Sequence, residues 1–292
     1  MARKGKTSRS ASTSSQKRKR PARRTNGARA ASNGARRERR SALVTGASSG
    51  IGLELAKKLA AEGYDLIVTS DNGKKLRDAV KEIRRDHPDT GISVVVADLA
   101  EPEGARKLHR QVKTARLNPD VLVNNAGAGV WGDFPRTDLE DELDIIQLNT
   151  ASVVAITKLF LPAMIRRGSG RILFTASVAS LAPTPLLTVY GATKAFVYSF
   201  SQALGDELDG TGVTVTALLP GATDTNFFKR AGAEHTQTAQ GDLADPERVA
   251  HDAYDTLMKG HDHVITPTSE RLMSVVNKFM PDRTVAHQNR IE

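Results

Sequence analysis

Along most of the chain, short apolar runs alternate with longer stretches in which apolar residues recur every three to four positions. Short runs rich in Val, Ile and Leu are typical of buried strands, whereas a 3.6-residue period is typical of helices with one apolar face. The first such unit reads "SALVTGASSGIGLELAKKLAAEGYDLIVTS". It predicts a strand, a glycine-rich turn, a helix with Ile51, Leu55 and Leu59 on one face, and a second strand.

The same alternation predicts seven strands, at 42–45, 65–69, 92–97, 121–123, 171–175, 213–219 and 263–266. After the first helix, further helices are expected at roughly 73–86, 102–116, 138–166, 189–209 and 246–259. Strands that alternate with helices form a parallel sheet that helices cover on both faces. The predicted fold class is therefore α/β, a single doubly wound domain of Rossmann type with a seven-stranded parallel sheet.

Charge separates the chain into unlike parts. The chain has 42 basic and 33 acidic residues. Residues 1–40 contain 15 of the basic residues and one of the acidic residues, a net charge of +14. The remaining 252 residues carry a net charge of −5. Residues 1–40 contain no Val, Ile, Leu or aromatic residue, which predicts a disordered basic arm. The predicted organisation is this arm at 1–40, the α/β domain at 41–267 and a C-terminal extension at 268–292 with a short amphipathic helix.

The arm has two open interpretations. A polycation binds nucleic acid or an anionic surface weakly, nonspecifically and in a salt-dependent way, and "KRKR" at 17–20 also resembles a nuclear import signal. Alternatively, it is a solvated tail with no dedicated partner. If the arm sets the function, the protein would be a dinucleotide-binding, nucleic-acid-tethered protein without turnover.

Composition excludes several kinds of site. The chain has no cysteine, which rules out disulfides, thiolate zinc sites and cysteine nucleophiles and is compatible with a cytoplasmic location. The apolar stretch 152–165 is interrupted by Lys158 and Pro162 and is too short for a membrane span, so no transmembrane segment is predicted. His261 and His263 have no carboxylate or thiolate cluster beside them, so no metal site is predicted either.

The glycine-rich turn "TGASSGIG" follows the first strand and begins the first helix. Gly46 permits a tight turn, Gly50 lets the backbone approach a pyrophosphate, and Gly52 lets the helix pack closely on the strand. The N–H groups at the helix start, with the positive end of its dipole, would face the phosphates. We therefore expect a dinucleotide at this turn, with Ser48, Ser49 and Ile51 also in contact.

Two later strand ends should line the same crevice. Asp98 and Leu99 end the third strand, where a carboxylate can accept a hydrogen bond from an adenine amino group. "NNAG" ends the fourth, where small residues let the backbone run beside the cofactor; its predicted contacts are Asn125, Ala126 and Gly127. Either motif taken alone is equally compatible with an ordinary capped turn.

In "VYGATKAF", Tyr190 and Lys194 are four positions apart and would share one helix face. A cation beside a phenol lowers the pKa of the phenol from its usual value of about 10 and makes it a usable proton donor. A packed tyrosine beside an exposed lysine is the alternative that the pair alone does not exclude.

Taken together, these motifs resemble the short-chain dehydrogenase/reductase family, over roughly residues 41 to 267. The shared features are TGASSGIG, NNAG, Asn149, Ser177, the Tyr190-x-x-x-Lys194 pair and "PGATDT" at 220–225, in the family's order and spacing. "NNAGAGVWGDF" and "VYGATKAFVYSFSQAL" look most like its general NAD(P)-dependent oxidoreductase branch, which acts on carbonyls or secondary alcohols.

The resemblance implies a role for each catalytic residue. Tyr190 would exchange a proton with the substrate oxygen as hydride passes to or from the nicotinamide. Lys194 would lower the pKa of Tyr190 and bind the nicotinamide ribose, and Ser177 would bind the substrate oxygen. Asn149 would perturb the helix at 138–166 and hold a water that connects Lys194 to solvent. Further cofactor contacts are implied at Pro220, Gly221, Thr223 and Thr225.

The choice between NAD and NADP depends on the end of the second strand. Ser70 stands where NAD users of the family have an acid, Asp71 where many NADP users have arginine, and Ser49 where NADP users often have Arg or Lys. The displaced acid favours NAD, although Lys74 or Lys75 could reach a 2′-phosphate.

Three further expectations concern the substrate and assembly. Residues 226–243, which we call the lid segment, lie where members of the family have a segment that covers the substrate. The expected substrate is a largely apolar carbonyl compound or alcohol. Trp131, Phe134, Pro183, Leu186, Phe227 and Phe228 would wall its pocket or else serve as ordinary core or subunit contacts. By resemblance, the helices at 138–166 and 189–209 would pair between subunits in a homodimer or homotetramer.

Overall fold

The computed structural model describes residues 40–267 and residue 284. Of the predicted basic arm, only Arg40 falls within these residues. The predicted C-terminal extension lies outside them apart from Thr284, so the amphipathic helix expected there is not described.

Seven parallel strands form one sheet in the order β3-β2-β1-β4-β5-β6-β7. They are β1 (Ser41–Thr45), β2 (Asp65–Ser70), β3 (Ile92–Val96), β4 (Val121–Asn124), β5 (Gly170–Thr175), β6 (Val213–Pro220) and β7 (His263–Thr266). Each observed strand agrees with a predicted one to within one residue at either end. The predicted doubly wound fold is confirmed.

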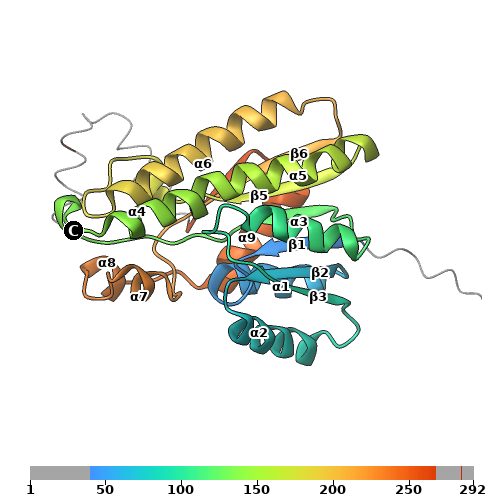
Figure 1. Ribbon diagram of the computed structural model, residues 1–292, viewed down its shortest axis with the longest axis horizontal. Helices are drawn as coiled ribbons and strands as arrows, with labels where there is room; N and C mark the ends of the chain where they lie inside the picture. Colours follow the sequence, from blue (N-terminus) through green and yellow to red (C-terminus); the bar gives the residue numbers. More distant parts are fainter. Residues whose placement is uncertain (1–39, 268–283, 285–292) are drawn as a thin grey trace, which may run out of the picture. The chain divides into compact units, whose positions relative to one another are not determined.

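Helices cover both faces of the sheet (Figure 1). The long helices are α1 (Gly50–Ala61), α2 (Gly73–Asp86), α3 (Gly104–Thr114), α4 (Leu139–Ile146), α5 (Ser152–Arg167), α6 (Thr188–Glu207) and α9 (Pro246–Lys259). Two short ones, α7 (Phe227–Ala231) and α8 (Gln237–Gln240), lie in the lid segment. Helices α3, α5 and α6 pack on one face, and α1, α2 and α9 on the other.

Alternation along each strand builds one core on each face. In β1, Leu43 joins the cluster under α3, α5 and α6, whereas Ala42 and Val44 join the cluster under α1, α2 and α9. In β2, Ile67 and Val68 divide in the same way. A strand buried on both faces reads as a continuous apolar run because every residue enters a core.

The helix predicted at 138–166 is divided by a π-helical turn, Gln147–Ala151, between α4 and α5. By length and hydropathy alone, Leu139–Arg167 could cross a membrane, but 44% of its most apolar window is buried inside the protein. Its α5 part places Ile156 and Phe160 in the core beneath the sheet. These contacts are typical of a core helix.

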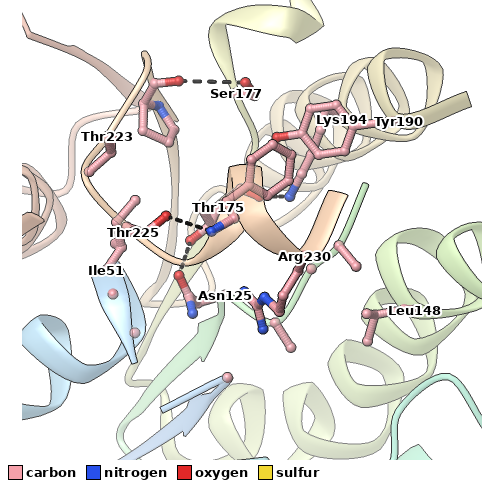
Figure 2. A pocket seen from close by; sticks show the side chains of 18 of the residues that line it. Ile51, Asn125, Leu148, Thr175, Ser177, Tyr190, Lys194, Thr223, Thr225 and Arg230 are labelled. Carbon is pink, nitrogen blue, oxygen red and sulfur yellow. Dashed lines mark hydrogen bonds between the residues drawn. The ribbon is translucent and has the colours of Figure 1, made fainter. Parts of the chain in front are cut away.

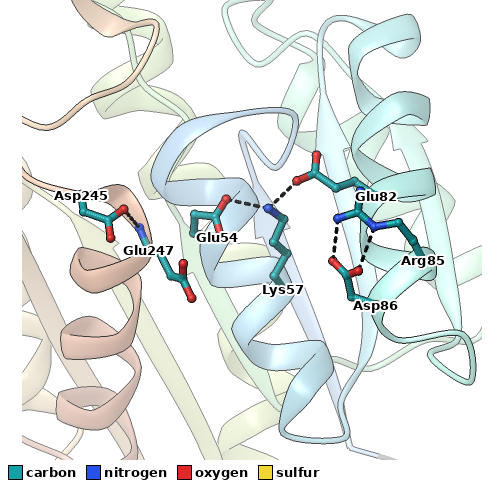
Figure 3. A network of polar contacts seen from close by, with 7 residues as sticks. All are labelled: Glu54, Lys57, Glu82, Arg85, Asp86, Asp245 and Glu247. Carbon is teal, nitrogen blue, oxygen red and sulfur yellow. Dashed lines mark hydrogen bonds and ion pairs between the residues drawn. The ribbon is translucent and has the colours of Figure 1, made fainter.

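An ion-pair network joins two helices on the opposite face. The ammonium of Lys57 in α1 lies 2.8 Å from the Glu54 carboxylate and 2.5 Å from that of Glu82 in α2 (Figure 3). Although partial burial works against it, the pKa of Lys57 is raised because both carboxylates bind the ammonium. The network joins α2 to α1.

Connections leave β1 and β4 toward opposite faces of the sheet, because β1 is followed by α1 on one face and β4 is followed by α4 and α5 on the other. A doubly wound sheet opens a crevice at the carboxyl ends of its strands where the strand order reverses. Here that point lies between the neighbouring strands β1 and β4.

Candidate active site

A cavity of about 460 Å³ opens at the carboxyl ends of the strands. It is within the range of roughly 300–1,000 Å³ typical of small-molecule sites. Every residue that the sequence predicts for cofactor binding lines this cavity. Of the predicted catalytic residues, Ser177, Tyr190 and Lys194 line it (Figure 2). Asn149 is not a lining residue, but it is hydrogen-bonded to Ala128, which is one.

The glycine turn between β1 and α1 has no space for side chains. A Cβ at Gly46 would lie 2.9 Å from the Cα of Ala126, and one at Gly52 would lie 2.3 Å from the carbonyl oxygen of Gly46. Gly46 and Gly50 also have φ of +66° and +57°, a region that favours glycine. The chain therefore has to keep bare backbone at this turn.

The start of α1 is open to a ligand. Its N-cap, Ser49, makes no side-chain cap hydrogen bond, and the first turn contains no acidic residue. The first N–H groups of a helix are good donors to an anion, because the helix itself does not use them. Together with the bare glycine backbone, they fit the diphosphate of a dinucleotide.

Polar contacts fix the "NNAG" loop against β1. The Thr45 hydroxyl accepts from the backbone N–H of Asn125 at 2.9 Å and of Ala126 at 3.0 Å. The Asn125 amide donates to the Thr45 carbonyl at 3.0 Å, and the Thr175 hydroxyl donates to Asn125 at 3.2 Å. A Cβ at Gly127 would lie 3.1 Å from Nζ of Lys194, so the loop passes directly over that lysine.

The end of β2 places a carboxylate at the cavity wall. The Ser70 hydroxyl lies 3.0 Å from that of Ser48 and donates to Asp71 at 2.8 Å, and the Asp71 carboxylate also accepts from the N–H of Asn72 at 2.8 Å. At the end of β3, the exposed Asp98 accepts from the N–H of Ala100, and Leu99 is buried. Asp71 and Asp98 are therefore the two acidic residues that line the cavity.

Ser177, Tyr190 and Lys194 converge from two elements. Ser177 follows β5 and starts a short 3₁₀ turn, where its hydroxyl accepts from the N–H of Ala179 at 3.1 Å. Tyr190 and Lys194 lie one turn apart near the start of α6, and all three are more than nine-tenths buried. The Lys194 ammonium donates to the Thr175 carbonyl at 2.8 Å and lies 5.7 Å from the centre of the Tyr190 ring.

Burial controls the protonation of this pair. It raises the pKa of Tyr190 to about 12, against the opposing hydrogen bond with Ser177, and it lowers the pKa of Lys194 to about 8. The shift in the pKa of Tyr190 is therefore upward, opposite to the prediction that Lys194 lowers it. Desolvation of the phenolate is the largest cause of this shift, and the Lys194 ammonium donates its hydrogen bond to the Thr175 carbonyl.

Asn149 occupies the centre of the π-helical turn and is 1% exposed. Its amide nitrogen donates to the Ala128 carbonyl and to the Thr193 hydroxyl, both at 2.9 Å, and its oxygen accepts from the N–H of Ala128 at 3.1 Å. A Cβ at Gly127 would lie 3.2 Å from the same oxygen. Asn149 thus joins the "NNAG" loop to α6, directly behind Lys194.

The lid segment closes one side of the cavity. Thr223 and Thr225 follow β6, and a Cβ at Gly50 would lie 2.9 Å from Cγ2 of Thr225. The ring of Phe227 in α7 packs against Tyr190 with centroids 5.0 Å apart, and Phe228 also lines the cavity. Of the other residues expected in an apolar wall, Phe134 is 59% exposed and none is a lining residue.

Sequence reasoning missed several contributors. Thr45 and Thr175 fix the backbone of the site through hydrogen bonds to Asn125. Both could have been predicted, because each is the last residue of a strand that precedes a predicted cavity loop. Leu148 and Arg230 line the cavity, yet neither belongs to a motif. Their positions depend on packing that no local pattern shows.

Comparison with known proteins agrees with this geometry. The family model described as short chain dehydrogenase matches residues 40–236. A short-chain type dehydrogenase/reductase of Sinorhizobium fredii is 39% identical over 215 residues, which are 72% of this chain and 82% of that protein. A very-long-chain 3-oxoacyl-CoA reductase of Phaeosphaeria nodorum is 37% identical over 60% of this chain, which spans only 52% of that longer protein.

A solved structure is similar over the whole domain. A short-chain dehydrogenase from Sphingobium yanoikuyae, in complex with NADPH, has a TM-score of 0.73 and 29% identity, over 82% of this chain and 93% of that chain. The residues at the strand ends, the glycine turn and the match to the family model all indicate the same class of enzyme, a dinucleotide-dependent dehydrogenase. The chain belongs to the short-chain dehydrogenase family of oxidoreductases, which act on carbonyl and alcohol groups with NAD or NADP.

Proposed function

We propose that the protein transfers hydride between a nicotinamide cofactor and a carbonyl or secondary alcohol, with Tyr190 as the general acid and base. The observation that carries this proposal is the convergence of Ser177, Tyr190 and Lys194 on one cavity, beside the glycine turn. Bound nicotinamide supplies or accepts the hydride, and the side chains manage the proton.

Each side chain has a task that follows from its surroundings. With a pKa of about 12, Tyr190 keeps its proton at neutral pH and can donate it to a carbonyl oxygen. Ser177, which is hydrogen-bonded to Tyr190, orients that oxygen. Lys194 provides positive charge behind the phenol and binds the nicotinamide ribose, while Asn149 holds the loop and helix that position Lys194.

We infer that the substrate is largely apolar. Around the reacting side chains, the cavity is lined by Val178, Leu187, Phe227 and Phe228. Apolar walls with a few convergent polar groups are typical of sites that bind an apolar molecule in a fixed orientation. A ketone or secondary alcohol of small or medium size would fit this wall.

We propose NAD rather than NADP as the cofactor. The Asp71 carboxylate is fixed by Ser70 and by the N–H of Asn72, at the strand end where a ribose 2′-OH would be bound. Among the described residues, neither Lys74 nor Lys75 lines the cavity. Asp71 would accept from a free hydroxyl and repel a 2′-phosphate, so NADH should bind more tightly than NADPH and Asp71→Ser should reduce the difference. Tighter binding of NADPH by the wild-type protein would contradict this choice.

We also propose that the protein is a homodimer or homotetramer. Leu139, Leu143 and Ile146 form an exposed apolar stripe on α4, and Phe196 on the neighbouring α6 is 42% exposed. In Figure 1, α4, α5 and α6 lie along one side of the sheet. Clustered exposed apolar side chains of this kind mark protein–protein contacts.

A turnover screen tests the proposed function. The full chain is incubated with NADH or NADPH and a panel of ketones of increasing size, and with NAD⁺ or NADP⁺ and the matching alcohols, while nicotinamide absorbance is followed. Turnover of apolar members of the panel is expected. If the protein binds dinucleotide but turns over no carbonyl or alcohol, the catalytic proposal fails.

A further inference from the structure

Arg230 is a cation of the lid segment that faces the cavity and that no motif accounts for. It lies in α7 three positions after Phe227, so the two side chains share a helix face. Phe227 contacts the Tyr190 ring, and Arg230 is itself a lining residue. Figure 2 shows the Arg230 side chain extending from α7 into the space that Asn125 and Leu148 also line.

Backbone hydrogen bonds and buried side chains fix the position of α7. The Trp131 N–H donates to the Ala231 carbonyl at 3.0 Å, and the Ala233 N–H donates to the Phe228 carbonyl at 2.8 Å. Ala231 and Ala233 are 6% and 1% exposed. These contacts fix the helix end that carries Arg230, so its direction into the cavity follows from the fold.

Among the charged residues that line the cavity, Arg230 is the cation that is available to bind an anion. The charged lining residues are Asp71, Asp98, Lys194 and Arg230. The Lys194 ammonium is already bound to the Thr175 carbonyl, and the two acids are acceptors. Within residues 40–267, the Arg230 guanidinium has no hydrogen-bond or ion-pair partner, although it offers five donors in a planar fork.

The start of α7 lies beside the predicted phosphate site. Thr225, two residues before the helix, approaches Gly50 so closely that a Cβ there would lie 2.9 Å from the threonine methyl group. The uncapped N-terminus of α1 begins at that same glycine. A diphosphate bound there would present its other oxygens toward the lid segment, and an arginine fork matches phosphate oxygens in a bidentate geometry.

We propose that Arg230 binds the diphosphate of the dinucleotide from the lid segment, opposite the glycine turn. Backbone N–H groups of α1 would hold one side of the diphosphate, and the guanidinium would hold the other. This inference rests on dinucleotide binding by the cavity and not on the role of Tyr190.

Titration calorimetry with ADP-ribose and adenosine tests the proposal, because both contain the adenine and ribose and only ADP-ribose contains the diphosphate. Arg230→Gln should weaken ADP-ribose binding about 10- to 100-fold, the loss typical of a hydrogen bond between charged groups, and should leave adenosine binding unchanged. Arg230→Lys, which keeps the charge without the fork, should give an intermediate loss. Lys229→Gln, which changes a neighbouring cation outside the cavity lining, should bind both ligands as the wild type does.

Three results would overturn the proposal. One is unchanged ADP-ribose affinity in Arg230→Gln. Another is an equal loss for adenosine, which would indicate a structural effect. The third is a loss of ADP-ribose affinity in Lys229→Gln as large as that in Arg230→Gln, which would indicate a general effect of positive charge on the lid segment. Since ADP-ribose lacks nicotinamide, Tyr190→Phe should bind it normally, and failure of the catalytic proposal would leave this test intact.

Discussion

At the glycine turn, Gly46 and Gly52 let three backbone segments pack closely: the end of β1, the start of α1 and the "NNAG" loop. Of the two glycines, Gly52 has less space for a Cβ atom. Its Cβ would lie 2.3 Å from the Gly46 carbonyl oxygen and 2.4 Å from the Asn125 amide. Since the first contact is with backbone, the turn itself would have to move. The bare turn is thus required for the strand–helix contact as well as for a ligand.

We predict that Gly52→Ala destabilises the protein by about 1–3 kcal/mol, the cost of overpacking, and weakens dinucleotide binding. Gly205→Ala in α6 is the matched control, because its Cβ would meet only Val215 at 3.7 Å. There, replacing a helical glycine should stabilise by about 0.5–1 kcal/mol. Urea unfolding measures both changes, and equal stability of the two variants would contradict the steric account.

The pKa of Lys194 predicts how carbonyl reduction depends on pH. With a pKa lowered to about 8, Lys194 is charged below that pH and neutral above it, whereas Tyr190 keeps its proton until about pH 12. The rate of reduction should therefore fall as pH rises through about 8, and loss of the lysine charge causes the fall.

Measurements of kcat/KM for reduction, at pH values from about 6 to 11, check this prediction. In Lys194→Arg, which stays charged throughout that range, the decline near pH 8 should disappear even if the absolute rate is lower. A wild-type profile that stays flat to pH 10.5, the usual pKa of lysine, would show that Lys194 does not control reduction.

At the residue scale, the sequence predicted positions better than energies. The spacing of Tyr190 and Lys194 was sufficient to place both on one helix face, and the structure has both in the cavity wall. The direction of the Tyr190 pKa shift was wrong because spacing does not reveal burial. Arg230 was missed because its direction depends on the packing of Ala231 and Ala233, which belong to no motif.

At the element scale, the π-helical turn between α4 and α5 is the main departure from the predicted helices. The periodicity of 138–166 indicated one helix, which the family resemblance implied that Asn149 would perturb, and the π-helical turn is centred on that residue. What the sequence did not show is that Asn149 makes three hydrogen bonds to Ala128 and Thr193, which fix its side chain behind the cavity wall. π-helical turns of this kind are frequent at functional sites.

We predict that Asn149→Ala destabilises the protein by about 1–3 kcal/mol, because the part-buried N–H and carbonyl of Ala128 and the buried hydroxyl of Thr193 lose their partner. Thr150→Ala is the control from the same turn. Its hydroxyl bonds only to the Ile146 carbonyl on the exposed side, so the change should be within about 0.5 kcal/mol. Denaturant unfolding of both variants tests the difference, and an Asn149→Ala protein as stable as the wild type would refute it.

At the scale of the whole molecule, the sheet could be predicted almost completely. Strands such as β1 and β2 are buried on both faces, so each appears in the sequence as an uninterrupted apolar run, and glycine or polar turns separate it from the next helix. The sequence does not show which apolar helix faces are buried and which are exposed. The apolar stripe on α4 has the same helical period as a core face, and only the structure shows that it is exposed.

The stripe leads to a prediction about assembly. Leu143→Glu should convert an oligomer into a smaller species, because it places a charge at the centre of the apolar contact. Val94→Glu is the control, since Val94 is similarly exposed, at 41% against 47%, but lies on the edge strand β3. Light scattering coupled to size-exclusion chromatography measures the masses. A monomeric wild-type protein, or an unchanged mass in Leu143→Glu, would contradict the proposed oligomer.

The proton-donating role of Tyr190 is tested most directly by single-turnover reduction of a ketone from the panel, with dinucleotide affinity measured on the same samples. Tyr190→Phe should slow the reduction about 10²- to 10⁴-fold, the usual contribution of a general acid, with the dinucleotide dissociation constant unchanged. Tyr198→Phe, which alters a half-buried tyrosine of the same helix beside His263, should react as the wild type does. Reduction by Tyr190→Phe at the wild-type rate would contradict the account.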